Sequence, residues 1–388
     1  MPFSAADAAA DGGERRKTSQ VLHRHLMRIG LLLVIPVLCW PVSGALGWDI
    51  TEKFSVNGIA AGSMQCQQVS NAENKCRGAA PLQPELRFMP DEQNEFLVKL
   101  GFAAGNGLNK ELPVNVSPWG ADLEDDVTDI NGRDRSYLLT AWYKHTANLG
   151  AAGNLGLSAG IIDATDYLDQ NRYSNDEYTQ FMNSSLVNAP SALLPSYDAG
   201  AALEWQAGGW SLASVVMQVG ENDAGNTYDF VGVQARRTVD LAMGPGNYRV
   251  IVAGTSHDFP RPGANGDARR RLLIFSFDQQ FAPNIGAFMR VGWQDEDAAI
   301  NYKALYSAGI DFDGALWNRS DDNLGIGYAW LNGGNLGIDK SHVGEAYYRF
   351  AMGPGLSITA DLQVISENVD SAGGPDGWIL GIRTTFEF

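Results

Sequence analysis

The hydrophobic pattern of this chain is clearest over its last residues, 378–388, where apolar and polar side chains alternate. One set of alternate positions is apolar or aromatic apart from a single threonine: Trp378, Leu380, Ile382, Thr384, Phe386 and Phe388. The positions between them carry charged residues and glycine. Because successive side chains of a strand point to opposite faces, this segment predicts a strand with one apolar face. A strand that ends on an aromatic residue favours the closing strand of an outer-membrane barrel, with lipid outside and water inside.

The same two-residue period recurs from residue 54 onward, and no amphipathic helical run competes with it. Turn-forming residues separate about sixteen such segments, close to the length of a tilted membrane strand. The predicted strands are 54–60, 83–89, 96–104, 136–146, 154–163, 197–206, 210–220, 228–238, 246–255, 270–280, 284–293, 301–312, 322–331, 342–351, 355–365 and 378–388. The first two are the weakest, and fourteen or eighteen strands are the alternatives. The sequence therefore predicts an all-β fold, a transmembrane antiparallel β-barrel.

The connections between the predicted strands alternate in length. With both termini in the periplasm, the periplasmic turns are short, as at 207–209, 281–284 and 351–354. The extracellular connections include four longer ones: 105–135, 164–196, 256–269 and 366–377. Short turns on one side and long loops on the other are typical of membrane barrels, whereas a soluble sandwich gives no reason for this parity. Closure into a barrel also pairs every backbone N–H and C=O group, which hydrocarbon requires.

Aromatic residues cluster near the ends of the predicted strands. They are Trp142, Tyr143, Trp205, Trp210, Tyr248, Trp293, Tyr302, Tyr306, Trp330 and Trp378. Such residues are expected in girdles at the two membrane interfaces, and ordinary core aromatics are the alternative.

The N-terminal part of the chain reads as a targeting segment. The apolar run at 29–38 is much shorter than the roughly 20 residues of a membrane helix. Arg28 precedes this run, and residues 45–47 offer a plausible cleavage site, so the pattern predicts a secretory signal peptide. We therefore expect residues 1–47 to be an extension and signal, and residues 48–388 to form the barrel.

Charge and cysteine content narrow the class of protein. The formal net charge is −17 at pH 7, which argues against nucleic acid as a partner. Beyond the predicted signal the chain keeps two cysteines, Cys66 and Cys76. An even number in an oxidising compartment favours a disulfide across a short loop, and two free thiols are the alternative.

The longest extracellular connection, 164–196, is the main candidate for a functional site. A structureless loop of this size is usually functional. Its planar aromatic rings can cover the apolar faces of sugars, while its amides and carboxylates can bind sugar hydroxyls. The candidate residues for a pore constriction and for sugar binding are Asn171, Arg172, Tyr173, Asp176, Glu177, Gln180 and Asn183. A solvated surface loop is the alternative.

Three stretches carry a resemblance to a known family. The first is 175–183 (NDEYTQFMN), and the last is 381–388 (GIRTTFEF). The second consists of three successive segments, 325–328 (GIGY), 345–350 (EAYYRF) and 356–365 (LSITADLQVI). In these residues the chain resembles the carbohydrate-selective porins of the outer membrane, over most of 160–388. The resemblance implies a sixteen-stranded barrel that passes sugars passively through a channel narrowed by inward-folded loops. The acidic second loop departs from the family pattern.

This resemblance also sets the expected partners and location. We expect carbohydrate solutes, outer-membrane lipid and lipopolysaccharide, and the barrel-assembly machinery, which would engage the C-terminal strand. The expected location is the outer membrane of a Gram-negative bacterium, and a homo-oligomer is left open. We expect no cofactor, no metal and no enzymatic activity.

Charged residues occupy the predicted inner face of several strands. On the predicted register the lumen-lining set is Glu204, Arg236, Arg249, Arg290, Glu345, Arg349, Asp361 and Arg383. An arginine on the lipid face would cost about 2–4 kcal/mol at mid-membrane, so these residues are expected inside. Arginines that face acids of the constriction loop would set a transverse field that orients polar solutes. Charges that merely line a wide water channel are the alternative.

Two motifs suggest other chemistry. Residues 156–160 match the G-x-S-x-G nucleophile pattern, but they lie inside an alternating strand with no helix after it. The acidic stretch 120–134 contains a run of oxygen ligands at 129–134 that could bind Ca²⁺, but it lacks the helix and bidentate Glu of an EF-hand. We interpret the first as chance and the second as surface acidity.

Several functions therefore compete. The first is a passive, sugar-preferring porin with an open, polar lumen, and a general porin or a channel for acidic polysaccharide is a variant of it. The second is an outer-membrane lipase or acyl transferase, which would need Ser158 and His145 together on the outer face. The third is a structural or adhesive barrel with a plugged lumen.

Overall fold

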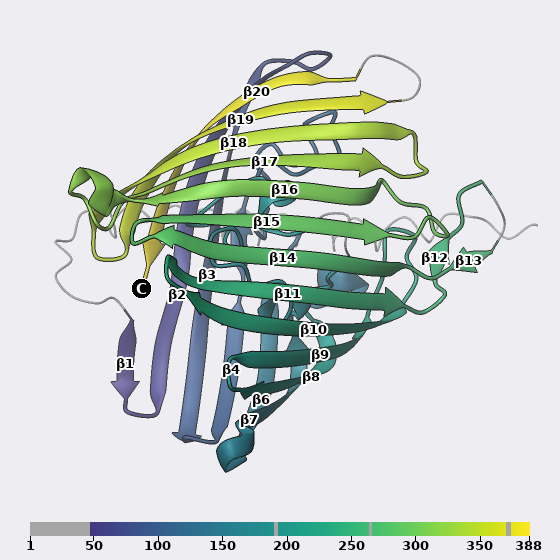
Figure 1. Ribbon diagram of the computed structural model, residues 1–388. Coiled ribbons are helices and arrows are strands. Elements are labelled where there is room, and N and C mark those ends of the chain that lie inside the picture. Colours follow the sequence, from purple (N-terminus) through teal and green to yellow (C-terminus); the bar gives the residue numbers. More distant parts are fainter. Residues whose placement is uncertain (1–46, 190–192, 264–265, 370–373) are drawn as a thin grey trace, which may run out of the picture. The chain divides into compact units, whose positions relative to one another are not determined.

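The computed structural model describes residues 47–189, 193–263, 266–369 and 374–388 (Figure 1). The extension and signal predicted over residues 1–47 therefore lie outside the described residues, except Gly47. Among the described residues, no helix combines the length and the apolar character needed to cross a membrane.

One large antiparallel sheet dominates the described chain. Its strands are β1 (Trp48–Thr51), β2 (Phe54–Val69), β3 (Lys75–Asp91), β4 (Asn94–Leu100), β5 (Phe102–Ala104), β6 (Leu138–Asn148), β7 (Asn154–Ile162), β8 (Asp198–Ala207), β9 (Trp210–Val219), β10 (Tyr228–Leu241), β11 (Gly244–Thr255), β14 (Arg271–Ala282), β15 (Ile285–Gln294), β16 (Tyr302–Asp313), β17 (Asn323–Gly333), β18 (Ile338–Gly353), β19 (Leu356–Val369) and β20 (Asp376–Glu387). A separate two-stranded hairpin joins β12 (Phe259–Pro260) to β13 (Asp267–Ala268). The helical elements are η1 (Ile130–Gly132), η2 (Gly150–Ala152), η3 (Ala164–Asp166), α2 (Ser184–Val187) and η4 (Gly314–Trp317).

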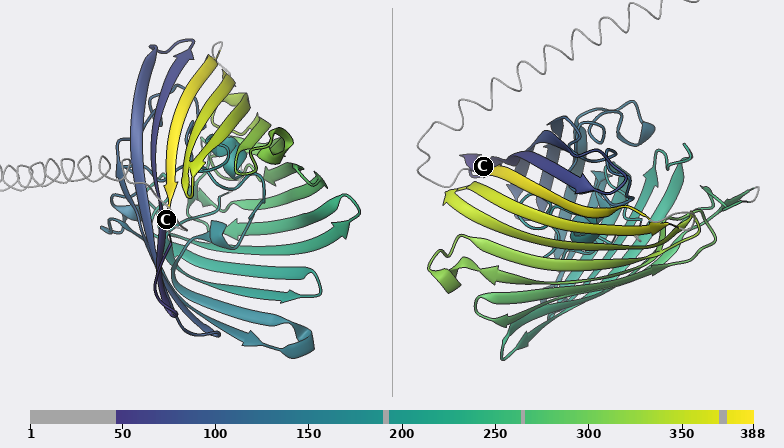
Figure 2. Two further views of the ribbon diagram at one scale, coloured as in Figure 1. Left: turned by 90° about the vertical axis from the view of Figure 1, so that its left-hand side faces the viewer. Right: turned by 90° about the horizontal axis from the view of Figure 1, so that it is seen from above.

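The sheet closes on itself as a sixteen-stranded barrel, which confirms the predicted fold class. Neighbours in sequence pair from β2 onward, with β4 and β5 together filling one place beside β3. The ring closes where β20 pairs with β2, from Ile59 opposite Glu387 to Val69 opposite Gly377. Figures 1 and 2 show the strands wrapped around a central space, with β1 as a short addition to β2.

The last strand shows how the alternation maps onto this barrel. On β20 the side chains of Leu380 and Ile382 lie on the outer face and are exposed, whereas Ile379 and Arg383 point inward and are buried. The same alternation of exposed and buried positions runs through β9, β10, β17 and β19. The outer face is therefore apolar and continuous, as hydrocarbon requires.

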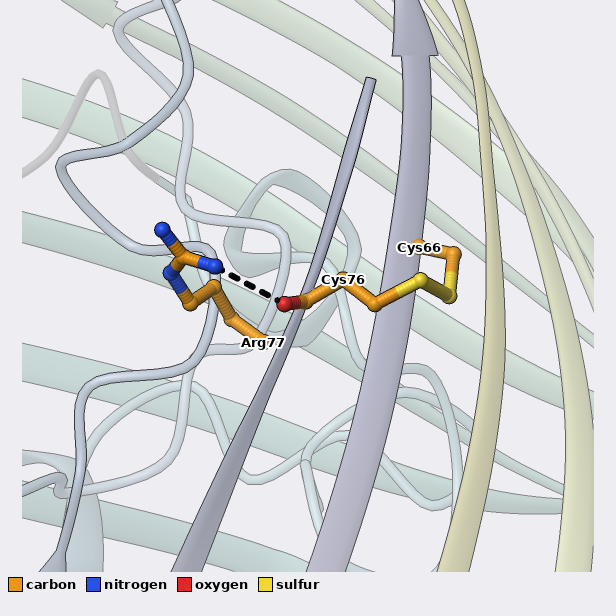
Figure 3. The surroundings of a disulfide bond; sticks show 3 residues. All are labelled: Cys66, Cys76 and Arg77. Carbon is orange, nitrogen blue, oxygen red and sulfur yellow. Dashed lines mark hydrogen bonds between the residues drawn. A yellow bond between two sulfur atoms is a disulfide. The ribbon is translucent and has the colours of Figure 1, made fainter. Parts of the chain in front are cut away.

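The predicted connection at 61–82 is wrong, because β2 and β3 continue through it as one long hairpin. Their pairing reaches Gln67 opposite Lys75, and Asn71, with φ of 61°, lies in the short turn at 70–74. Small and polar residues in this stretch hide the alternation. Cys66 and Cys76 face each other across the hairpin, where a disulfide joins them (Figure 3). Arg77 donates a hydrogen bond of 3.1 Å to the Cys76 carbonyl beside it.

Most of the predicted girdle aromatics lie on the outer face, but two do not. Tyr306 stacks on Trp330 with ring centroids 5.1 Å apart, and the Trp293 indole donates to the Tyr306 hydroxyl at 3.0 Å. Trp142 packs instead against the inner apolar core, and Tyr302 is buried with its hydroxyl on Glu367. A side chain near a strand end reaches the girdle only if its register points it outward.

Candidate functional site

Two long connections enter the barrel and pack together inside it. We call residues 105–137, between β5 and β6, loop 2, and residues 163–197, between β7 and β8, loop 3. The Gly120 amide donates to the Met182 carbonyl at 2.8 Å, and the Trp119 indole donates to the Glu177 carbonyl at 2.9 Å. The Trp119 ring also meets the Tyr178 ring edge-on. The two loops therefore form one inward body, visible within the ring in Figure 2.

The long loops fill part of the lumen at the end of the barrel where they lie. Many inner-face side chains of the strands from β9 to β20 are apolar and buried there, among charged side chains such as Arg249 and Arg290. The buried wall residues include Val215, Phe230, Ile251, Ile274, Leu305, Leu331, Val343 and Ile379. Burial of one such side chain stabilises the packed state by about 1.5–3 kcal/mol. The loops are thus held by a hydrophobic core as well as by polar contacts.

Aromatic residues of loop 3 fit into spaces left by glycines of the wall. Phe181 packs edge-on against Phe288 and Tyr347, with ring centroids 5.5 Å and 5.0 Å away. A Cβ atom on Gly286 would lie 2.1 Å from the ring of Tyr173, a distance that no real contact permits. Glycine at this wall position is therefore required by the docked loop.

Arg290 of β15 is the central polar anchor of loop 3. Its guanidinium is fully buried, and its Nε donates to Asp169 at 2.7 Å. Its other nitrogens donate to the Ser174 hydroxyl and to the Leu186 carbonyl, both at 3.1 Å, and to the Ser174 carbonyl. One wall side chain thus holds the first half and the second half of loop 3 together. Such a charge-assisted network is strong because every donor points at a fixed acceptor.

Glu345 and Arg383 anchor the tip of loop 3. Glu345 of β18 accepts the backbone N–H groups of Met182 at 2.5 Å and Asn183 at 2.9 Å. Asn183 in turn caps α2, its side chain accepting from the Ser185 amide. Arg383 of β20 donates to the carbonyls of Glu177 at 2.7 Å and Gln180 at 3.0 Å. The carboxylate binds backbone donors and the guanidinium binds backbone acceptors, so together they fix the path of the tip.

The predicted sugar-binding residues of loop 3 divide between two sides of the loop. Asn171, Tyr173 and Asn183 are buried, because they face the wall and the loop core rather than a solute path. Asn171, for example, donates to the Phe277 carbonyl of β14 at 3.0 Å. The residues that keep access to the lumen are the exposed Arg172 and the half-buried Asp176, Glu177 and Gln180.

The predicted lumen charges divide in the same way. All eight point inward, but loop 3 and its core cover five of them: Arg249, Arg290, Glu345, Asp361 and Arg383. Arg249 pairs with Asp278 of β14 at 2.6 Å, and both side chains are buried. Glu204, Arg236 and Arg349 stay half-buried. The covered arginines Arg249, Arg290 and Arg383 therefore do not face solutes, as a transverse field would require, but bind residues beneath loop 3.

A row of ion pairs on the opposite wall was not predicted from the sequence. On the inner face of β3, β4, β6 and β8, Arg87 pairs with Glu95 at 3.1 Å, Lys99 with Glu85 at 3.7 Å, and Lys144 with Glu204. We call these three pairs the charge ladder. All six side chains remain partly exposed to the lumen. Charged residues two apart, as in Glu85 and Arg87, were the available signal, but the weak prediction of β3 hid it.

The structure gives no support to the nucleophile or the calcium interpretation. Ser158 is buried inside the barrel beside Tyr167 and pairs in register with Lys144 of β6. His145 follows Lys144 and therefore lies on the opposite, outer face of the barrel, away from Ser158. In loop 2 the carboxylates serve separate partners, such as Asp126 on the Leu123 amide and Asp125 on Lys110. Among the described residues, no group of three or more His, Cys, Asp or Glu side chains could hold a metal ion.

Comparison with known proteins agrees with this geometry. A sequence model described as "Carbohydrate-selective porin, OprB family" matches residues 124–388. An uncharacterized protein of Aquifex aeolicus (strain VF5) is 30% identical over 319 residues, which is 81% of this chain and 91% of that one.

Solved structures of low sequence identity share the fold. The high-pH structure of Pseudomonas putida OprB is 13% identical, with a TM-score of 0.67 over 87% of this chain and 94% of that one. The outer membrane channel DcaP of Acinetobacter baumannii is 8% identical, with a TM-score of 0.55 over 86% of this chain and 97% of that one. Because the family match covers most of the barrel and its inward loop, the chain belongs to the carbohydrate-selective porins of the OprB family.

Proposed function

We propose that this protein is a porin of a Gram-negative outer membrane through which mono- or small oligosaccharides diffuse passively. The barrel would place its long-loop end outside the cell and its short turns in the periplasm. Loops 2 and 3 would form the constriction. The observation that carries the proposal is the docked loop 3, which narrows a closed sixteen-stranded barrel and leaves polar side chains on its free side.

The free side of loop 3 has the chemistry that sugars need. Arg172 is exposed, and Asp176, Glu177 and Gln180 are half-buried, so charged and amide groups can reach a passing hydroxyl. The charge ladder across the lumen offers further donors and acceptors. The buried residues Asn171, Tyr173 and Asn183 would act by holding the loop in place.

Single-channel recording in planar bilayers tests this function directly. We expect the refolded mature protein to give a steady conductance that mono- or oligosaccharides reduce at millimolar concentration. Arg172→Ala should weaken the effect of sugar, whereas Arg261→Ala, an exposed residue beside β12, should leave it unchanged. A conductance that no sugar alters would reduce the assignment to a general porin. No conductance from well-folded protein would favour a plugged, structural barrel.

The family and the fold are those of channels and not of enzymes. An outer-membrane lipase built on Ser158 would need that side chain beside His145 on the lipid face. Lipid hydrolysis that Ser158→Ala abolishes would overturn the channel assignment.

A further inference from the structure

The free side of the constriction carries an uneven set of charges. Lys99 of β4 interacts electrostatically with Glu85 of its own wall and with Asp122, Asp163 and Asp166 from loops 2 and 3. Glu177 at the tip of loop 3 acts on the same region, since its strongest charged neighbours are Asp176, Asp122 and Lys99. Several carboxylates therefore share one lysine.

Two of these acids have no base of their own. Within the described ranges, neither Asp166 nor Glu177 forms an ion pair or a side-chain hydrogen bond with another residue, and Asp166 is exposed. Asp122 receives only neutral donors, the Gln83 amide and the Tyr197 hydroxyl, both at 2.6 Å. These three carboxylates therefore depend on the one shared base, Lys99.

The bases of the lumen are mostly committed elsewhere. Arg290 is paired with Asp169 and Arg249 with Asp278, and both arginines are buried under loop 3. Lys144 is paired with Glu204 and Arg87 with Glu95 in the charge ladder. Arg172 of loop 3 is exposed, and Arg236 of β10 and Arg349 of β18 are half-buried at the lumen, but none of the three forms an ion pair with these acids among the described residues. Lys99 is the base that acts on Asp122, Asp166 and Glu177, so this part of the passage carries more acids than bases.

A buried hydroxyl at the same place points to a polar occupant. Only 5% of the surface of Tyr178 is exposed, and its hydroxyl has no hydrogen-bond partner among the described residues. The hydroxyl lies among the charges of Asp122, Glu177 and Asp176. A buried polar group of this kind is normally satisfied by water or a ligand. The Tyr178 hydroxyl can therefore form a hydrogen bond with the water shell of a cation or with a hydroxyl group of a solute.

We propose that Asp122, Asp166 and Glu177 make this channel selective for cations. Among carbohydrates, it would then pass neutral sugars and amino sugars more readily than sugar acids, a part of the inference that rests on the proposed function. A negative, narrow passage concentrates counter-ions and excludes like charges, because low-dielectric walls focus the field.

The selectivity should rise with pH. Asp166 is open to solvent on one side but surrounded by protein on the others, and this partial loss of water, with repulsion from Asp163, raises its pKa to about 7. Desolvation, with repulsion from Asp176 and Asp122, raises the pKa of Glu177 to about 8. Lys99 faces both groups and lowers both pKa values, whereas Glu85 and Asp122 also face Asp166 and raise its pKa. An acid with a raised pKa is neutral below that value and ionised above it. The passage should thus gain negative charge as the pH rises from about 6 to 9.

Reversal potentials in a KCl gradient test the inference without any sugar. We expect wild-type current to be carried mainly by K⁺, and the double variant Asp166→Asn/Glu177→Gln to lower the K⁺/Cl⁻ permeability ratio by about threefold. Glu92→Gln, in the exposed periplasmic turn between β3 and β4, is the matched control and should change nothing. Both substitutions keep the shape of the side chain, and heat-modifiable migration on gels checks that each variant folds.

Liposome swelling with glucose, glucosamine and gluconate supplies the second readout. Gluconate should enter most slowly in wild type and gain most in the double variant. An anion-selective or unselective wild-type channel would overturn the inference, as would a double variant with unchanged selectivity. Cation selectivity without any response to sugars would leave this inference standing and refute the proposed function, whereas sugar entry through an anion-selective channel would do the reverse.

Discussion

The two walls of this barrel have similar apolar outer faces but different inner faces. The wall from β9 to β20 packs apolar side chains and buried charged anchors against loop 3, whereas the wall from β3 to β8 presents the partly exposed charge ladder to the lumen. Strand β14 shows the first type, with Leu272, Leu273, Ile274 and Phe275 apolar on both faces. Strand β4 shows the second, with Glu95 and Lys99 inside and Phe96 and Val98 outside. Contact with lipid thus determines the residues of the outer face, and contact with a docked loop determines those of the inner face.

The largest difference between the walls should appear when one arginine is removed from each. Arg290→Ala leaves Asp169 buried and unpaired, so we expect it to destabilise the protein by about 3–5 kcal/mol and to free loop 3. Its channels should show larger and noisier currents. Arg87→Ala, in the charge ladder, should cost less than about 1 kcal/mol. Urea unfolding in lipid vesicles measures both, and equal losses would contradict the distinction between the walls.

The apolar side of the comparison can be tested at Phe181. Phe181→Ala removes a ring that is buried against Phe288 and Tyr347, and we expect a loss of about 3–4 kcal/mol from the cavity it leaves. Leu203→Ala, on the outer face of β8, empties no packed core and serves as the control. A loss at Phe181 no larger than that at Leu203 would mean that loop 3 is not docked in solution.

The disulfide should matter less, and only locally. Replacing Cys66 and Cys76 by serine opens a loop closed over a sequence separation of 10, for which we expect a loss of about 2–3 kcal/mol. Cys66 lies on the outer face of β2, between the inward and buried Gln65 and Gln67, whereas the anchors of loop 3 lie on the inner face, so the single-channel current should not change. Thermal unfolding with and without reductant measures the effect, and a changed current would show that the hairpin and the constriction are coupled.

The smallest effect is expected within the charge ladder. Lys144→Gln breaks a partly exposed pair with Glu204, and such pairs contribute about 0.2–1 kcal/mol. Unfolding measurements should show a loss within that range that shrinks further in high salt, since exposed charges are screened. A loss of unfolding free energy as large as that of Arg290→Ala would show that the charge ladder is as shielded from water as the anchors of loop 3.

The sequence predicted the barrel well because the membrane imposes one rule on every strand. Lipid contact makes alternate residues apolar, so the alternating runs around Ile382 and Leu362 predict β20 and β19. Alternation is less regular where a strand extends past the apolar belt, so the sequence predicts a connection where β2 and β3 continue as a hairpin around Cys66.

The candidate site could be predicted only as far as the loop that carries it. Period-two patterning places Arg290 inside the barrel, but nothing local indicates that it meets Asp169 and Ser174 rather than water. Contacts between a loop and distant strands produce no periodic pattern in the sequence. The sequence therefore predicts sugar ligands at the polar residues Asn171 and Asn183, whereas in the structure their side chains bind the barrel wall.

The anchor at Arg383 orders the steps by which this protein must assemble. Arg383 lies on the last strand and holds carbonyl groups about two hundred positions earlier in the chain, at Glu177 and Gln180. Loop 3 cannot complete its docking until β20 has arrived and closed the ring against β2. Refolding should thus show a fast phase that protects the strand amides and a slower one that protects the Met182 and Asn183 amides. A newly inserted barrel would, for that interval, be a wider hole than the mature one.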